Sequence, residues 1–321
     1  MRCPGDPGRK EDPADVLARG RIVLTVMEDR DMCREHAEKQ KSLGNLSGAR
    51  TWYEKALAAC EAGYDTEKNA GTAHELIRAL NDLGEARADL MDLKGAKELF
   101  DRALELSLGL AENDSSTQTF GDAADCYEHL GGLSRASGQS DEAKEYYRHV
   151  LEIRELLCSR EETAASRRGL AKICEELAEI AAEEGNLSAT LVLYEKDVEM
   201  REAAAAQTHD EADLKALRAA YERFGDLEDA VNEKKEASEW YAKALRTAEQ
   251  TADMTGAAID RAYLGLMNYK ACMLLGEGSP ERIGMLTRAA EIFAALAREE
   301  PRTAFYQSNY DIIRAKLEEE L

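Results

Sequence analysis

Proline is scarce in this sequence, with five residues among 321. Three lie within the first thirteen residues, and the other two are Pro280 and Pro301. Because proline ends or kinks a helix, the long interval without it favours uninterrupted helices. The apolar fraction of 44% is ordinary, so the main body is expected to fold. Residues 1–13 are polar and rich in proline, and we expect them to be disordered.

Paired cysteines and long apolar runs are also missing. The seven cysteines are scattered and form no CxxC motif, which argues against a disulfide framework or a zinc site and favours reduced thiols. The apolar run near the N-terminus, Ile22 to Val26, is too short to span a bilayer, and no signal peptide is evident. We therefore expect a cytoplasmic protein that makes no use of a membrane.

Positive charge is in short supply. Asp and Glu outnumber Lys and Arg by 64 to 42, which gives a formal net charge of -22. Such a field repels nucleic-acid phosphates and anionic lipids, and it attracts basic surfaces. The composition therefore argues against a nucleic-acid partner and favours a basic protein or peptide, although solubility alone would also account for the charge.

Signatures of enzyme chemistry are absent as well. The five histidines form no HExxH motif, and no glycine-rich phosphate-binding loop occurs. The many glutamates are expected to lie on exposed faces of helices. Such faces offer no pocket that would separate the pKa values of a catalytic pair. We expect no catalytic residue, no cofactor and no metal ion.

What the sequence does contain is a repeat with a period of 47 residues. A small residue recurs at Ala49, Ala96, Ala143, Thr190 and Ala237. Four positions later stands an aromatic residue, at Tyr53, Phe100, Tyr147, Tyr194 and Tyr241. Thirteen positions before the small residue stand Leu83, Leu130, Leu177 and Phe224. His36 falls in this last column and is expected to be a buried core residue, as are Cys33 and Cys174 in a neighbouring column.

Each unit is expected to form two antiparallel helices, because the column spacings of three and four residues mark one face of a helix. A break rich in glycine and asparagine divides the two helices at Gly44-Asn45, Lys94-Gly95, Gly138-Gln139, Gly185-Asn186 and Asn232-Glu233. These residue types tolerate the left-handed conformation that ends a helix. A single helix pair cannot bury its own apolar face, so the units should stack.

The motif Leu83-Gly84 followed by Ala96-x-x-x-Phe100 resembles the consensus of the tetratricopeptide-repeat (TPR) family. Leu130-Gly131 with Ala143 and Tyr147 repeats the match. The period exceeds the usual TPR length of about 34 residues and is similar to long-repeat bacterial arrays. The resemblance implies an all-α fold, a right-handed α-solenoid of antiparallel helix pairs. The expected array covers residues 14–300, in units near 29–68, 69–114, 115–161, 162–208, 209–255 and 256–300, with a capping helix over 301–321.

In TPR proteins the first helix of each pair lines a concave surface that receives a peptide or a partner helix. Carried over to this sequence, that surface would comprise Arg78, Asp82, Glu85 and Asp89, then Asp125, Glu128, His129 and Arg135, then Lys172, Glu175, Glu176, Glu179 and Glu183, and finally Glu222, Arg223, Asp226 and Asp229. We expect nearby cations to relieve part of the repulsion between these carboxylates, for example Arg78 beside Asp82 and Arg218 beside Glu222. The remaining acidic excess favours a basic segment as partner, and the alternative is a merely solvated helix face.

Three functions follow in descending order. The first is a scaffold or adaptor that holds a protein segment in an acidic groove. The second is a peptide-sensing or regulatory subunit that acts with a separate DNA-binding or effector partner. An enzyme is the weakest. A clamp for a terminal carboxylate, for which Asn81, Lys172 and Arg223 are the available residues, is disfavoured because carboxylates surround them. The oligomeric state is not encoded in any recognisable pattern.

Overall fold

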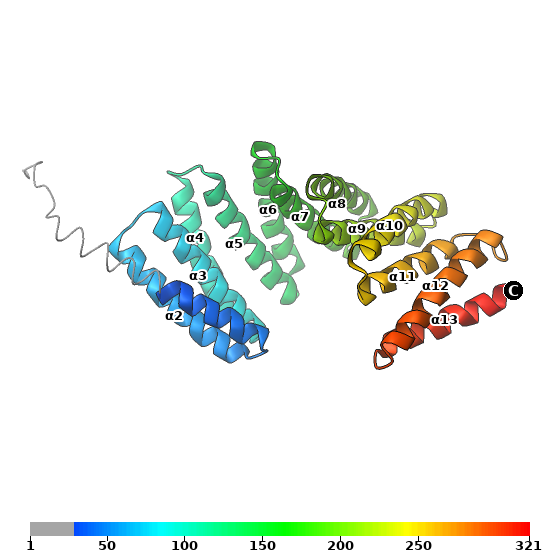
Figure 1. Ribbon diagram of the computed structural model, residues 1–321. Coiled ribbons are helices and arrows are strands. Elements are labelled where there is room, and N and C mark those ends of the chain that lie inside the picture. The colour runs from blue at the N-terminus through cyan, green and yellow to red at the C-terminus, as the bar shows by residue number, and fades with distance from the viewer. Residues whose placement is uncertain (1–28) are drawn as a thin grey trace, which may run out of the picture. The chain divides into compact units, whose positions relative to one another are not determined.

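Helices and short loops make up all of the chain that the structure describes, residues 29–321 of a computed structural model (Figure 1). The predictions of disorder over 1–13 and of an array beginning at residue 14 therefore fall partly outside the described residues. Within 29–321 no strand occurs. The predicted all-α class is confirmed.

The chain divides into two compact units, Met1–Leu157 and Cys158–Leu321. Unit 1 contains a helical segment over 29–42, followed by α2 (Leu46–Thr66), α3 (Ala70–Asp89), α4 (Leu93–Ala111), α5 (Thr117–Ala136) and α6 (Ser140–Arg160), whose last residues cross the boundary. Unit 2 contains α7 (Ala164–Glu183), α8 (Leu187–Thr208), α9 (Glu211–Ala230), α10 (Lys234–Thr255), α11 (Ala258–Met273), α12 (Pro280–Glu299) and α13 (Ala304–Glu320). Consecutive helices pack against each other from α2 to α5 and from α7 to α13.

The helix boundaries keep a constant register. The first helices of the pairs, α3, α5, α7, α9 and α11, begin at residues 70, 117, 164, 211 and 258, so each starts 47 residues after the one before. The second helices α4, α6, α8 and α10 begin at residues 93, 140, 187 and 234, with the same spacing. Residues that share a column of the sequence therefore hold equivalent places on successive helices.

A left-handed residue forms the turn inside each of five successive pairs. Gly44, Gly138 and Gly185 have φ between 72° and 75°, and Met91 and Asn232 take the same conformation with φ of 63° and 68°. The break predicted at Lys94-Gly95 is therefore wrong by a few residues. Gly95 lies inside α4, where its backbone N–H donates to the side chain of Asp92, the residue that caps the helix.

Met91→Gly is expected to raise the free energy of unfolding by about 0.5–1 kcal/mol. The left-handed conformation costs a residue with a Cβ atom about 1–2 kcal/mol, and the greater freedom of glycine in the unfolded chain offsets part of that gain. The Met91 side chain is 77% exposed, so little packing is lost. Urea denaturation would measure the change, with Gly138→Met as the reciprocal variant that should lose stability.

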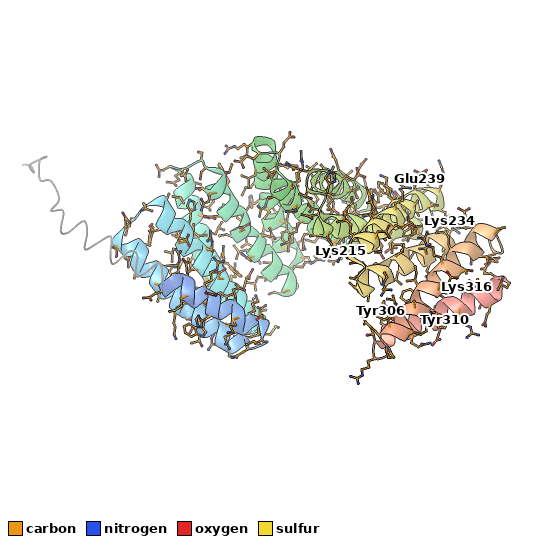
Figure 2. All side chains as sticks on the ribbon, in the orientation of Figure 1. Lys215, Lys234, Glu239, Tyr306, Tyr310 and Lys316 are labelled. Carbon is orange, nitrogen blue, oxygen red and sulfur yellow. The ribbon has the colours of Figure 1, made fainter. Side chains whose placement is uncertain are left out.

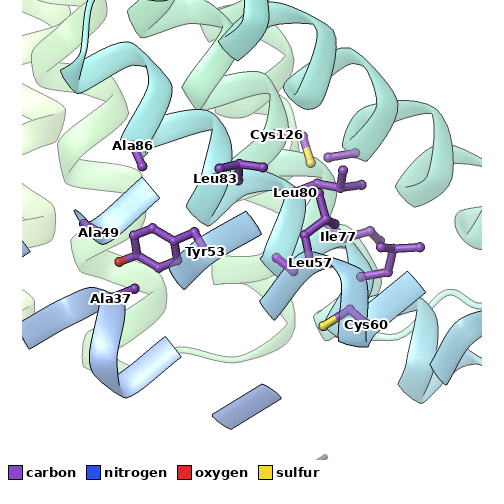
Figure 3. Close-up of a cluster of buried hydrophobic side chains, with 13 residues drawn as sticks. Ala37, Ala49, Tyr53, Leu57, Cys60, Ile77, Leu80, Leu83, Ala86 and Cys126 are labelled. Carbon is purple, nitrogen blue, oxygen red and sulfur yellow. The ribbon is translucent and has the colours of Figure 1, made fainter. Parts of the chain in front are cut away.

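The apolar core follows the predicted small and aromatic columns. In unit 1 a buried cluster that includes Ala49, Tyr53 and Leu80 connects the helical segment 29–42 with α2, α3, α4 and α5 (Figure 3). The ring of Phe100 lies directly over Gly84, where an added Cβ would come within 2.4 Å of the ring. The absence of a side chain at the glycine leaves room for the aromatic ring, which explains why the glycine and the aromatic residue recur together in the repeats.

His36 is an exception to the predicted core. It is exposed, and its ring lies 4.7 Å from that of the half-buried Trp52. The next residue, Ala37, is fully buried, and it stands 47 residues before Gly84, in the adjoining column. The register is therefore kept in this helical segment, but the prediction that His36 is buried was wrong. Cys33 and Cys174 are buried, as predicted.

Candidate functional site

The residues predicted to bind a partner all lie on first helices, and each is exposed or half-buried. We call the surface that they form the first-helix face. In unit 1 it comprises Arg78, Asp82, Glu85 and Asp89 of α3 and Asp125, Glu128, His129 and Arg135 of α5. In unit 2 it comprises Lys172, Glu175, Glu176, Glu179 and Glu183 of α7 and Glu222, Arg223, Asp226 and Asp229 of α9. Each unit is considered by itself.

On α3, cations from the helical segment 29–42 hold the carboxylates. Arg34 lies 3.0 Å from Asp82, and Lys41 lies between Glu85 and Asp89, at 3.8 Å and 3.1 Å. Arg78 lies 3.8 Å from Glu75, and its charge also opposes the rise in the pKa of Asp82, so the predicted relief of Asp82 by Arg78 occurs without a direct ion pair. Arg34 of the neighbouring helical segment approaches Asp82 more closely and makes the direct ion pair.

The α5 part of the face repeats this arrangement. Arg154 of α6 reaches both Asp125, at 2.5 Å, and Glu128, at 3.5 Å. His129 stacks on Phe100 with ring centroids 4.9 Å apart, and its Nδ1 atom lies 3.6 Å from Glu85. One basic side chain thus serves two carboxylates here, as Lys41 does on α3.

In unit 2 the predicted pair of Arg218 and Glu222 is confirmed, at 3.0 Å. Lys270 of α11 lies 2.8 Å from both Glu222 and Asp226. Asp226 also accepts a hydrogen bond of 2.6 Å from the hydroxyl of Tyr241. Lys215, labelled in Figure 2, makes a further link between α9 and α11 through Asp260, at 2.9 Å. Ion pairs thus connect successive first helices of this unit.

A buried charged cluster lies beneath the α7 and α9 part of the face. Asp197 of α8 is fully buried and accepts from Arg201, at 2.5 Å, and Arg223, at 3.3 Å. The same arginines pair with Glu175, at 2.5 Å and 2.9 Å. The equivalent positions on α2, α4 and α10 are alanine, so the charge at Asp197 replaces a methyl group in the core. Burial raises the pKa values of both Asp197 and Glu175, and the arginines oppose this shift.

The remaining predicted residues complete the face. Arg135, Lys172, Glu176, Glu179 and Glu183 all have interacting partners. Asp229 is exposed on the last turn of α9, one turn beyond Asp226.

Asp82 is the most strongly perturbed carboxyl group of the face. Burial raises its pKa to about 6, and Glu85 and Glu38 add to the shift, while Arg34 and Arg78 oppose it. The unfolded value is about 3.9, so between about pH 4 and pH 6 the folded chain holds a proton that the unfolded chain has released. The contribution of Asp82 to stability is therefore fully present at low pH and is lost as the pH rises through about 6.

Asp82→Asn is accordingly expected to raise the free energy of unfolding by about 1–2 kcal/mol at pH 7.5 and to change it little at pH 4. The amide still offers Arg34 an acceptor but carries no charge to desolvate. Urea denaturation of both proteins from pH 4 to pH 8 would measure the difference. A variant that is less stable than the parent at pH 7.5 would show that the ion pair outweighs the cost of burying the charge.

Sequence reasoning missed the cations Arg34, Lys41, Arg154, Arg201 and Lys270, because it considered only the first helices of four units. The register contains a usable signal for two of them, since Arg154 and Arg201 stand 47 residues apart on equivalent turns of α6 and α8. Asp197 also carries a signal, as a charge in a column of small apolar residues.

Two further properties bear on the chemistry. Within residues 29–321 no group of three or more His, Cys, Asp or Glu side chains could hold a metal ion. No helix in the same range is both long enough and apolar enough to cross a membrane.

The fold is shared with several solved structures. The S. pombe nuclear import adaptor Nro1 matches with a TM-score of 0.63 and 13% identity, over 92% of this chain and 99% of that chain. Aspartyl phosphate phosphatase F from Bacillus subtilis matches with a TM-score of 0.58 and 12% identity, over 97% and 74%. A Rap protein complexed with Competence and Sporulation Factor matches with a TM-score of 0.50 and 14% identity, over 91% and 77%.

Residues 123–161 match the family model described as tetratricopeptide repeat. The chain as a whole has a TPR-like helical-repeat fold. The matched residues span most of α5 and all of α6, so this TPR segment contains Asp125, Glu128 and their shared partner Arg154. No curated protein sequence matches the chain. At these low identities the TPR-like structures establish the fold and no more.

Proposed function

We propose that this TPR-like protein is an adaptor or scaffold that holds a basic peptide or helical segment of a partner on its first-helix face. The observation that carries the proposal is the sharing of one cation between two carboxylates, by Lys41 and by Arg154. In each case the single positive charge of the shared cation faces two carboxylates. Lysine or arginine side chains of a partner would add charge-assisted hydrogen bonds to these carboxylates.

Asp82 supports the same partner chemistry. Its raised pKa means that ionisation is less favourable in the folded chain than in the unfolded one, because the carboxyl group is largely buried beside Glu38 and Glu85. A cation brought by a partner would lower that pKa and release a proton. The affinity for a basic segment is therefore expected to increase as the pH rises from 5 to 7.

The test begins with the selection of binders from a library of random peptides displayed on phage. We expect the selected peptides to be enriched in Lys and Arg relative to the starting library. Fluorescence anisotropy would then give the Kd of the strongest peptide for the parent and for the double variant Glu85→Lys/Asp125→Lys, whose altered side chains are both exposed. At low salt the variant should bind at least about tenfold more weakly, which corresponds to about 1.4 kcal/mol.

A matched control makes the same change of net charge elsewhere in unit 1. Glu54→Lys/Glu145→Lys alters exposed residues of the second helices α2 and α6, each of which pairs with an arginine on its own helix. This control should change the Kd less than about twofold. Selection of peptides without excess basic residues, or equal weakening by both double variants, would contradict the acidic first-helix face.

A peptide-sensing regulatory subunit is the second candidate, and the likeness to the Rap protein complexed with Competence and Sporulation Factor favours it. Such a protein would act with a separate DNA-binding or effector partner and would change conformation when its ligand binds. Small-angle scattering with and without the selected peptide distinguishes the two. An adaptor is expected to keep the same radius of gyration, and a sensor to change it.

A further inference from the structure

A cleft of about 620 Å³ lies in unit 1, and it shares no residue with the first-helix face. Its volume falls within the range of about 300–1,000 Å³ that is common for ligand pockets. The end of α2, the start of α3 and the last half of α4 form its walls. The lining side chains that carry the argument are Tyr64, Ala73, Leu76, Leu106 and Leu110.

The floor of the cleft is continuous with the apolar core. Leu76 is a member of the buried cluster of this unit, and Tyr64 and Leu106 pack against that cluster while remaining partly exposed. The rim is polar, since Lys68 and Glu105 are both exposed. An apolar group could therefore bury itself against the floor while its polar flanks stay in water.

The register of the repeats explains why the cleft exists. Ala73 is the fourth residue of α3, and the fourth residues of α5, α7, α9 and α11 are Phe120, Arg167, Leu214 and Arg261. Leu214 packs against the core of its own unit, whereas Arg261 pairs with Glu299. Among these five first helices, α3 alone has a side chain as small as a methyl group at this position.

The wall of the cleft that α4 forms also has a position with almost no side chain. Gly109 of α4 is equivalent to Leu156 of α6, 47 residues later. A Cβ atom added at Gly109 would meet no atom within 4 Å. Two positions that carry large apolar side chains on α5 and α6 thus carry almost none on α3 and α4, and they face the same space.

We propose that this cleft binds an aromatic side chain of a partner polypeptide, which takes the place that the register assigns to Phe120 in the following repeat. The apolar floor provides the burial, and an aromatic ring matches both that floor and the side chain that the next repeat carries at this position. This second contact extends beyond the acidic first-helix face and does not depend on it.

The test uses N-acetyl-phenylalanine amide as the probe and follows the methyl resonances of Leu76, Leu106 and Leu110 by NMR of the full chain. We expect saturable shifts of these resonances with the phenylalanine probe. N-acetyl-alanine amide and N-acetyl-lysine amide should bind at least about tenfold more weakly, because the buried apolar area sets the affinity. Shifts that are no larger with the phenylalanine probe than with the alanine probe would overturn the proposal.

Two variants fill the cleft from opposite walls. Ala73→Phe introduces the side chain of α5 at a buried position, and Gly109→Leu introduces that of α6 without any clash at the Cβ atom. Each should abolish saturable binding of the phenylalanine probe. The matched control Gly284→Leu, on the exposed surface of α12, likewise meets no atom within 4 Å and should leave binding unchanged. Binding that survives in a folded Gly109→Leu protein would also overturn the proposal.

Discussion

Gly84→Ala is expected to lower the free energy of unfolding by about 2 kcal/mol, although alanine is the better helix former. The new methyl carbon would lie within 2.4 Å of the Phe100 ring, which is itself buried. Either the ring must leave its position or α3 and α4 must separate. Chemical denaturation followed by circular dichroism would measure the loss.

Gly109→Ala is the matched control for this prediction, because it makes the same change on α4 in open space. It should raise the free energy of unfolding by about 1 kcal/mol. Replacement of Phe100 by leucine in the Gly84→Ala background should recover part of the loss. Equal effects of the two glycine substitutions would show that helix propensity governs both and that the close approach of the Phe100 ring to Gly84 has no steric consequence.

Arg201→Ala is expected to cost about 3 kcal/mol, because it removes one of the two arginines that neutralise the fully buried Asp197. Arg223 would then face both Asp197 and Glu175 alone. The loss arises mainly from leaving a buried charge without sufficient compensation, rather than from the intrinsic strength of one ion pair.

A double-mutant cycle isolates this effect. In the background Asp197→Ala, which restores the alanine found at the equivalent positions on α4 and α10, the further change Arg201→Ala should cost about 1 kcal/mol or less. The coupling energy is thus about 2 kcal/mol, measured by urea denaturation of the four proteins. If the two substitutions are additive, Asp197 does not depend on Arg201.

The sequence was sufficient to predict the repeat and the helix pairs, because these depend on local patterns. A small residue and an aromatic residue four positions apart define one helix face. Gly84 and Gly131 stand where the rings of Phe100 and Tyr147 pack against the first helix. The turn at Met91 was harder to locate, since the left-handed residue is not glycine there. The turn was predicted at Lys94-Gly95 because of the glycine, but Gly95 lies inside α4, the helix that Asp92 caps.

The ion pairs of the first-helix face could not be predicted in the same way. Long basic side chains reach across to a neighbouring helix, and the partner they choose depends on the crossing of the two helices. Lys41, for example, contacts both Glu85 and Asp89. The acidic residues were therefore identified as a set, whereas Arg218 was the one cation whose direct ion pair was predicted correctly. Two signals in the sequence pointed to the buried cluster, the charge of Asp197 in an apolar column and the 47-residue spacing of Arg154 and Arg201.

The most direct test of the acidic first-helix face is hydrogen exchange of the chain with and without the strongest selected peptide. We expect slower exchange in the second half of α3, around Glu85, and in the middle of α5, around Asp125, with no change in α2 and α4. Protection confined to the second helices, or protection that persists unchanged in Glu85→Lys/Asp125→Lys, would contradict it.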